Sequence, residues 1–271
     1  MQKFGFVQAS KVIESIKARE ETNMATYETF AAVYDEIMDD SLYDQWTDFS
    51  LRHLPKNAKT ILELACGTGV QAVRFAQAGY DVTGLDLSYE MLELAQKRAE
   101  IAGVMLELAQ ADMMALEGVG DFDAVTCYSD SLCYMGNEAA VLRVFEGVHS
   151  VLNHGGVFIF DVHSIYQMEE VFAGYSYHEN YEEFAFVWDT YKGEHEYSVV
   201  HELTFFVKDE NGEPERFIRR DEVHEERTYP IETYVDLLKQ AGFGSVEIFA
   251  DFEDKLPTET SQRWFFKAVK A

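Results

Sequence analysis

Short runs of apolar residues alternate with amphipathic stretches along the middle of the chain. The apolar runs predict strands, and the stretches between them repeat at helical spacing, which predicts helices. Alternation of this kind is typical of a parallel sheet covered by helices on both faces. The expected strands are 60–65, 80–85, 104–109, 122–127 and 157–161, and the expected helices are 70–78, 88–102 and 138–152.

The alternation stops over residues 165–230, where a different pattern takes its place. Apolar and polar residues there alternate at the spacing of half-buried strands. Asn211-Gly212 is a hairpin-turn signal. We therefore expect an inserted antiparallel sheet made of three strands, 184–191, 197–207 and 217–228.

The helical and strand patterns return after Pro230. A helix is expected over 231–241, followed by strands 245–249 and 263–269. Since no helix lies between these two strands, they should form an antiparallel hairpin. The sequence thus predicts an α/β fold with a seven-stranded, mostly parallel sheet, an antiparallel C-terminal hairpin and a small inserted antiparallel sheet.

The N-terminal part divides into two segments. Residues 1–23 have a short helical pattern in a polar context, and Met24 opens a stretch typical of a natural start, so we interpret 1–23 as a dispensable extension. Residues 24–56 are helical and aromatic and form a predicted cap or lid. The core is expected to comprise 57–164 and 231–271, with 165–230 on the substrate side or at an oligomer contact.

Composition and charge narrow the function. The chain has 271 residues and a formal net charge of −27, which argues against sequence-independent binding of nucleic acid or of an anionic membrane surface. Part of the charge is local. Residues 20–51 hold nine acidic residues and no Lys or Arg, and residues 165–230 hold 17 acidic and 6 basic residues. Such segments favour a cationic partner by electrostatic steering, or they serve solubility.

Three cysteines, Cys66, Cys127 and Cys133, lack any metal-ligand spacing. Free thiols suit a reducing compartment, so we expect a cytoplasmic protein. No apolar run has the length of a membrane helix, and the first residues lack the apolar core of a signal peptide.

The strongest chemical signal is the run Glu63-Leu-Ala65-Cys66-Gly67-Thr-Gly69. It follows a predicted strand and opens a helix, where small residues let the backbone approach a ligand and free N–H groups face it. Asp86 ends the next strand, and a carboxylate there is suited to the two hydroxyls of a ribose. A nicotinamide-type GxGxxG turn would need glycine where Val70 stands.

These motifs resemble those of the class I S-adenosylmethionine-dependent methyltransferases, which have a Rossmann-like sheet. The resemblance covers about residues 27–163 and 231–270. It implies S-adenosyl-L-methionine as cofactor and direct transfer of the methyl group. The cofactor-binding residues that it implies are Glu63, Ala65, Cys66, Gly67, Gly69, Asp86, Leu87, Met91, Ala111, Asp112, Met113 and Tyr128.

A narrower resemblance concerns the two ends of the chain. The opening YETFAAVYDEIM resembles a group of uncharacterised bacterial small-molecule-type methyltransferases. The inserted sheet with ERTYPIETYVDLLKQAGF resembles amino-sugar N-methyltransferases and, more loosely, glycine/sarcosine-type enzymes. In those relatives tyrosines of the first helices close over the cofactor, which implies this role for Tyr27 and Tyr34.

Candidates for acceptor chemistry follow the fourth and fifth strands. His163 is the best candidate for a base or an acceptor ligand, because strand ends at the carboxyl edge face the binding crevice. Tyr128 either lines the acceptor pocket or packs in the core. Asp130 either holds an ammonium group or caps the next helix. Tyr34 is a third catalytic candidate, from the predicted lid.

The other histidines and cysteines have simpler interpretations. No metal site is expected, because the histidines of the insertion lack a common ligand spacing. We interpret them as surface or interstrand residues, and Cys66 and Cys127 as core residues. The histidines concerned are His178, His195, His201 and His224.

Three functions remain open at this point. The first is a methyltransferase acting on a small, cationic acceptor such as an amine. The second is a methyltransferase acting on tRNA or another macromolecule. The third is a cofactor-binding or assembly protein without catalysis, in which the inserted sheet forms a homodimer.

Overall fold

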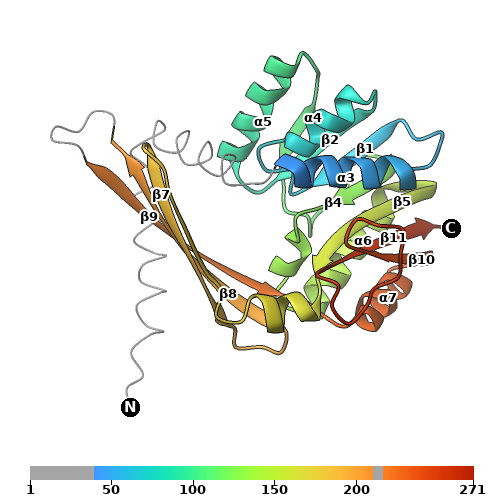
Figure 1. Cartoon of the computed structure of the whole chain (residues 1–271). Coiled ribbons are helices and arrows are strands. Elements are labelled where there is room, and N and C mark those ends of the chain that lie inside the picture. The colour runs from blue at the N-terminus through green and yellow to red at the C-terminus, as the bar shows by residue number, and fades with distance from the viewer. Residues whose placement is uncertain (1–39, 210–215) are drawn as a thin grey trace.

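The computed structural model describes residues 40–209 and 216–271, and its centre is a seven-stranded sheet (Figure 1). The strand order is β10-β11-β5-β4-β1-β2-β3. Five strands run parallel, and β11 pairs antiparallel with both β5 and β10. The bounds are β1 Thr60–Leu64, β2 Asp81–Asp86, β3 Glu107–Gln110, β4 Phe122–Cys127, β5 Leu152–His163, β10 Phe243–Ala250 and β11 Arg263–Lys270.

Helices cover both faces of this sheet, as the alternating pattern predicts (Figure 1). The helices α3, α4 and α5 pack on one face, and α6 and α7 pack on the other. The strands are buried on both sides, so successive residues enter different cores: Ile61 and Ile159 join the α3 side, whereas Leu62 and Phe158 join the α6 side. The bounds are α3 Asp40–His53, α4 Val70–Gln77, α5 Tyr89–Ala102, α6 Glu138–Val151 and α7 Ile231–Gln240.

The predicted Rossmann-like architecture is confirmed, including the antiparallel C-terminal hairpin of β10 and β11. The third strand is shorter than expected and begins at Glu107 instead of Val104. Residues of β3 are largely exposed, because β3 is an edge strand with a neighbour on only one side. Two short helical segments, η2 Ser131–Tyr134 and η3 Gln167–Val171, follow β4 and β5.

The insertion folds as a separate antiparallel sheet of four strands, where three were expected. The additional strand is β6, whose sequence SYHEN has four exposed residues and no apolar pattern. It pairs antiparallel with β7, so backbone hydrogen bonds, and not the burial of its side chains, make it a strand. The bounds are β6 Ser176–Asn180, β7 Phe184–Lys192, β8 Ser198–Lys208 and β9 Phe217–Arg227. In Figure 1 these strands form a long ribbon beside the core.

One face of the inserted sheet is apolar. Phe186 lies opposite Phe205, and Trp188 lies opposite Leu203, in the register of β7 and β8. Because side chains alternate with a period of two, His201 points to the same face as these residues. The register of β8 and β9 adds His224 and Glu226 to that face, which therefore carries an apolar half and a polar half.

Several predictions fall outside the described residues. They are the 1–23 extension, the beginning of the cap, Tyr27, Tyr34 and the Asn211-Gly212 turn. Of the predicted cap, α3 is described. No helix in residues 40–209 and 216–271 combines the length and the apolar character needed to cross a membrane.

Candidate active site

The glycine-rich run forms the tight turn between β1 and α4. Ala65, Gly67 and Gly69 all adopt positive φ, at 51°, 51° and 74°. A Cβ added at Gly67 would meet no atom within 4 Å, whereas one added at Gly69 would lie 2.6 Å from the Cβ of Ala95. Gly67 therefore borders open space, and Gly69 allows α5 to pack closely against the turn.

Asp86 holds the open side of the turn. One oxygen of its carboxylate accepts a hydrogen bond from the Gly67 N–H at 2.8 Å, and the other accepts from the Ser88 N–H at 2.9 Å. Ser88 in turn caps α5 by accepting from the Met91 N–H at 3.2 Å. The carboxylate thus lies where the ends of β1 and β2 meet, with Leu87 exposed beside it.

The third segment of the predicted cofactor site follows β3. The Ala111 N–H donates to the backbone oxygen of Asp86 at 3.0 Å, which ties this segment to the end of β2. The Asp112 carboxylate accepts from the Met114 N–H at 2.8 Å. These bonds hold the segments of Asp86, Met91, Ala111, Asp112 and Met113 together at the ends of β2 and β3, and their contact with the cofactor stays a prediction.

Glu63 is a buried acid directly beneath the turn. Burial raises the pKa of this carboxyl well above its usual value, and the negative Asp86 adds to the effect. Its Oε2 atom has no hydrogen-bond partner within the part of the chain that is described. An unpartnered buried carboxyl next to a turn that borders open space fits the polar methionine portion of S-adenosyl-L-methionine, with Asp86 at the ribose.

A cavity of about 320 Å³ lies between the core and the inserted sheet. Its residues come from α3, from the loop and η2 after β4, from the end of β5, from the end of η3, from β7, β8 and β9, and from the start of β11. Leu64 at the end of β1 is in register with Cys127 at the end of β4, so the cofactor turn and the loop that lines the cavity start side by side. The lining is Leu42, Trp46, Ser129, Asp130, Tyr134, His163, Phe172, Phe186, Trp188, His201, Leu203, Phe205, His224, Glu226 and Arg263.

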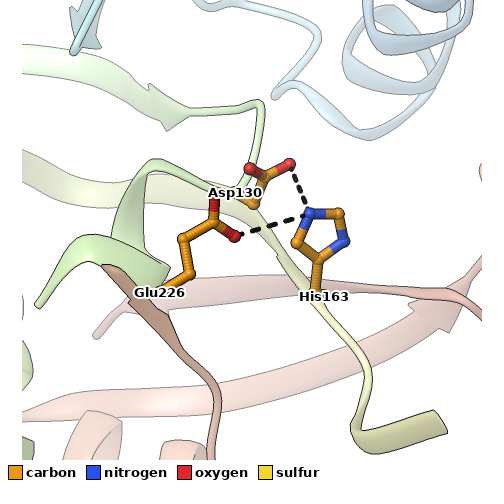
Figure 2. Close-up of side chains that lie close together, drawn as sticks. All are labelled: Asp130, His163 and Glu226. Carbon is orange, nitrogen blue, oxygen red and sulfur yellow. Dashed lines mark ion pairs between the residues drawn. The ribbon is translucent and has the colours of Figure 1, made fainter. Parts of the chain in front are cut away.

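One end of this cavity holds two buried polar side chains, His163 and Glu226, and the partly buried Asp130, which come from three separate segments (Figure 2). The Nε2 atom of His163 lies 3.2 Å from Oδ1 of Asp130 and 3.7 Å from Oε2 of Glu226. The three groups offer ligand atoms within 4.8 Å of one another, so the cluster could also hold a metal ion. The loop that presents Asp130 is strained, because Ser129 and Asp130 both adopt positive φ, at 53° and 51°.

Arg263 compensates the charge of the aspartates. It bonds Asp130 at 2.8 Å and forms an ion pair with Asp161, and it stacks on the ring of Trp46 at 5.4 Å. Burial alone would raise the pKa of Asp130, but His163 and Arg263 outweigh it and hold that pKa well below its usual value. Burial raises the pKa of Asp161, although Arg263 opposes the shift.

Glu226 differs from Asp130 because His163 lies farther from it, at 3.7 Å, and the effect of Arg263 does not outweigh burial. Burial raises the pKa of this carboxyl well above its usual value, and the nearby Asp130 adds to the effect. His201 lies 3.7 Å from the other oxygen of Glu226. Burial, with His163 nearby, lowers the pKa of His201 to about 4, so this imidazole is neutral near pH 7. Its Nδ1 atom accepts a hydrogen bond from Trp188 at 3.0 Å.

The structure separates the acceptor-site candidates. His163 is the last residue of β5, which is longer than predicted, and it reaches the cavity as expected. The phenol of Tyr128 does not line the cavity, because its ring stacks on Trp46 and its hydroxyl lies 2.5 Å from that of Ser50. Asp130 makes no helix-capping bond with its side chain, and its carboxylate faces Arg263 and His163 instead.

The structure also places the other histidines and the cysteines that the sequence analysis considered. His178 and His195 are exposed, whereas His201 and His224 pair across β8 and β9 and line the cavity. The interpretation of the four as surface or interstrand residues is confirmed, although it did not foresee that His201, which is 3% exposed, lines a cavity. Cys66, Cys127 and Cys133 are free and buried, which confirms the interpretation of the first two as core residues.

Several cavity residues were not predicted from the sequence, namely Trp46, Tyr134, Arg263 and Glu226. For Glu226 a signal was present, because residues 222, 224 and 226 of β9 lie on one face by alternation. Nothing local marked Arg263, whose role depends on the pairing of β11 with β5.

The strand order, the β1–α4 turn and the acid at the end of β2 together define a class I methyltransferase core. Comparison with known proteins agrees. A family model described as a methyltransferase domain matches residues 61–156. A protein of Geobacillus sp. (strain WCH70) that is named as a methyltransferase is 44% identical over 249 residues, covering 90% of this chain and all of the relative.

Solved structures give the same result. An S-adenosylmethionine-dependent methyltransferase from Clostridium acetobutylicum is 28% identical with a TM-score of 0.77, covering 90% of this chain and 99% of that one. The sugar N-methyltransferase KedS8 from Streptoalloteichus shares the fold at 22% identity and a TM-score of 0.71, covering 89% and 92%. The chain belongs to the S-adenosylmethionine-dependent methyltransferase family. It is an enzyme of that class, and S-adenosyl-L-methionine is its cofactor.

Proposed function

We propose that this enzyme transfers the methyl group of S-adenosyl-L-methionine to the nitrogen of a small amine bound in the cavity. The observation that carries the proposal is the buried His163, which lies between two carboxylates at the end of an aromatic-walled cavity. Aromatic faces and carboxylates attract cations. The fold relative KedS8, which is a sugar N-methyltransferase by name, also supports an amine as acceptor.

The cofactor supplies an activated methyl group on a sulfonium sulfur. The protein has to align the acceptor with it and manage one proton. We propose that Glu63 and Asp86 hold the methionine and ribose portions, while Tyr27 and Tyr34 remain candidates to close over the cofactor. The turn residues Ala65, Cys66, Gly67 and Gly69 border it through their backbone.

The proton step involves His163. An acceptor that enters as an ammonium ion gives one proton to the imidazole of His163, and the charged imidazolium is stabilised by Asp130 and Glu226. The freed lone pair of the nitrogen forms the new bond to the methyl carbon, and the carbon–sulfur bond breaks with its electrons left on sulfur. His163 then returns its proton to water. The phenol of Tyr128 has no part in this step, since it is packed against Trp46.

The two other functions are less well supported. The chain carries a net charge of −27, which opposes the phosphate contacts that a tRNA substrate needs. An assembly protein without catalysis would not need a charged cluster at the end of a cavity. The inserted sheet is still proposed as a homodimer contact, which light scattering of the full chain in solution would test. A cytoplasmic location stays part of this proposal, supported by three free thiols.

A methyl-transfer screen over amines, amino sugars, carboxylates and tRNA tests the proposal. We expect S-adenosylhomocysteine to form with an amine. His163→Asn should lower kcat by about 10²-fold or more, as for the loss of a general base. The control is His178→Asn, a change at an exposed histidine of β6, which should leave turnover unaltered. Turnover with tRNA alone, or an active His163→Asn variant, would contradict the proposal.

A further inference from the structure

Glu226 is a buried acid whose Oε2 atom lies 3.7 Å from Nε2 of His163, which is beyond hydrogen-bond distance. The residue is 5% exposed, and its Oε2 atom has no hydrogen-bond partner among the residues that the structure describes. The neighbouring Asp130 is different, because Arg263 bonds it at 2.8 Å. Burying a carboxylate oxygen that accepts no hydrogen bond is costly, so such an oxygen at a cavity indicates a missing ligand.

The ligand has to be a cation with a compact head. Glu226 faces Asp130, His163 and His201 from neighbouring elements, with Tyr134 of η2 hydrogen-bonded to it. Of these groups Asp130 is negative and paired, and His201 is neutral. An ammonium group placed here would meet the Oε2 atom directly.

The rest of the cavity indicates what the ammonium group is attached to. Beyond the polar end the walls are apolar, with Phe172, Phe186, Trp188, Leu203 and Phe205 among the lining residues. A sugar has several hydroxyls that need hydrogen-bond partners when buried. The apolar walls offer none apart from the Trp188 N–H, which already donates to His201.

We propose that Glu226 of the inserted sheet binds the ammonium group of the acceptor, and that the acceptor is an amine with an apolar alkyl or aryl body. This proposal rests on the amine acceptor argued above and adds its class and the residue that selects it. The inserted sheet then supplies specificity through both halves of its inner face, which are the acid of β9 and the aromatic residues of β7 and β8.

A divalent metal ion is the competing occupant, since Asp130, His163 and Glu226 offer three ligand atoms. The observations favour the ammonium group. The Oδ1 atom of Asp130 that faces His163 is the same atom that Arg263 bonds, so a metal ion there would lie beside a guanidinium cation. The apolar walls also provide no further oxygen ligands.

Calorimetry with the full chain saturated with S-adenosylhomocysteine tests the proposal. The probes are 2-phenylethylamine, its neutral analogue 2-phenylethanol, glucosamine and Mn²⁺. Wild type should bind 2-phenylethylamine more tightly than glucosamine, and Glu226→Gln should weaken that binding about tenfold or more, as for a hydrogen bond to a charged group. Binding of 2-phenylethanol should change little. The raised pKa of Glu226 adds a second readout, because amine binding should release a proton in wild type and not in Glu226→Gln.

Two variants keep the test clear. Glu225→Gln changes the adjacent exposed acid of β9 and should bind as wild type does. Glu226→Asp keeps the charge and should retain part of the affinity, which separates charge from folding. Equal amine binding by wild type and Glu226→Gln, preference for glucosamine, or tight Mn²⁺ binding lost in Glu226→Gln would overturn the proposal. Amines that bind through Glu226 without being methylated would contradict the proposed function and leave this inference standing.

Discussion

Asp130 and Glu226 both lie near Nε2 of His163, yet their surroundings move their pKa values in opposite directions. His163 and Arg263 keep Asp130 ionised, whereas burial and the nearby Asp130 raise the pKa of Glu226. Titratable groups whose environments separate their pKa values in this way are common at catalytic sites. Asp130 is therefore the fixed partner of His163, and Glu226 is the group that responds to a ligand.

Asp86 should contribute directly to cofactor affinity. Asp86→Ala removes the carboxylate suited to the ribose hydroxyls, and we expect the binding free energy of S-adenosylhomocysteine to weaken by about 1–3 kcal/mol. Titration calorimetry measures this change. Asp81→Ala, at the exposed start of the same strand, is the control and should bind normally. Equal affinity of Asp86→Ala and wild type would remove Asp86 from the site.

Glu226 should also make stability depend on pH. Its pKa in the folded protein is raised above the ordinary 4.5, so the folded chain keeps a proton that the unfolded chain loses. This contribution is complete below about pH 4.5 and is lost as the pH rises through the folded pKa. The stability of Glu226→Gln relative to wild type should therefore increase as the pH rises above about 4.5, by up to about 1.4 kcal/mol per pH unit.

Urea unfolding at several pH values measures this difference, with Glu225→Gln as the matched control. A constant difference between Glu226→Gln and wild type across that range would show that Glu226 titrates normally. Asp130 has the opposite sign, because its lowered pKa adds stability that is lost only as the pH falls.

At the scale of elements, two glycines of the β1–α4 turn have different roles: Gly69 allows close packing, and Gly67 borders the proposed cofactor site. Gly69→Ala should destabilise the fold strongly, because the added Cβ would lie 2.6 Å from that of Ala95 and φ is 74°. Gly67→Ala has space for its Cβ, so it should cost only about 1–2 kcal/mol for the left-handed backbone. Its methyl group would instead enter the open space beside Asp86 and weaken cofactor binding.

Thermal unfolding and calorimetry with S-adenosylhomocysteine together test this separation. We expect Gly69→Ala to lose more thermal stability than Gly67→Ala. We expect Gly67→Ala to lose affinity for S-adenosylhomocysteine although its fold remains stable. Full affinity in a folded Gly67→Ala variant would mean that the cofactor does not approach this part of the turn.

The elements also show which features a sequence can predict. The alternating pattern predicted the succession of strands and helices along the core. It could do so because each strand has its own apolar run and each helix has its own apolar face. The polar strand β6 was missed, because backbone pairing with β7 defines it. Glu63 and Asp86 were predicted because they lie within or next to a local motif. Arg263 and Glu226 were not, since strand register brings them to His163 from over 60 positions away.

At the scale of the whole molecule, the acidic surface should assist a cationic acceptor. Electrostatic attraction between exposed charges is screened within about 8 Å at physiological ionic strength. With cofactor saturating, the KM for an amine should therefore rise with salt, by about two- to tenfold between roughly 0.05 and 0.5 M NaCl, while kcat stays nearly constant. Steady-state kinetics at fixed pH measures both. If the KM did not depend on salt, the net charge of −27 would not attract the acceptor and would serve solubility alone.

The central claim is that the methyl group goes to an amine nitrogen in the cavity beside His163. The most direct measurement uses S-adenosyl-L-methionine with a ¹³C-labelled methyl group and ¹⁵N-labelled 2-phenylethylamine, with the product examined by NMR. We predict a direct one-bond ¹³C–¹⁵N coupling in the product, formed by wild type and strongly reduced in His163→Asn. A methyl group found on oxygen or carbon of any acceptor in the screen, with no ¹³C–¹⁵N coupling from this or any other labelled amine, would contradict the account.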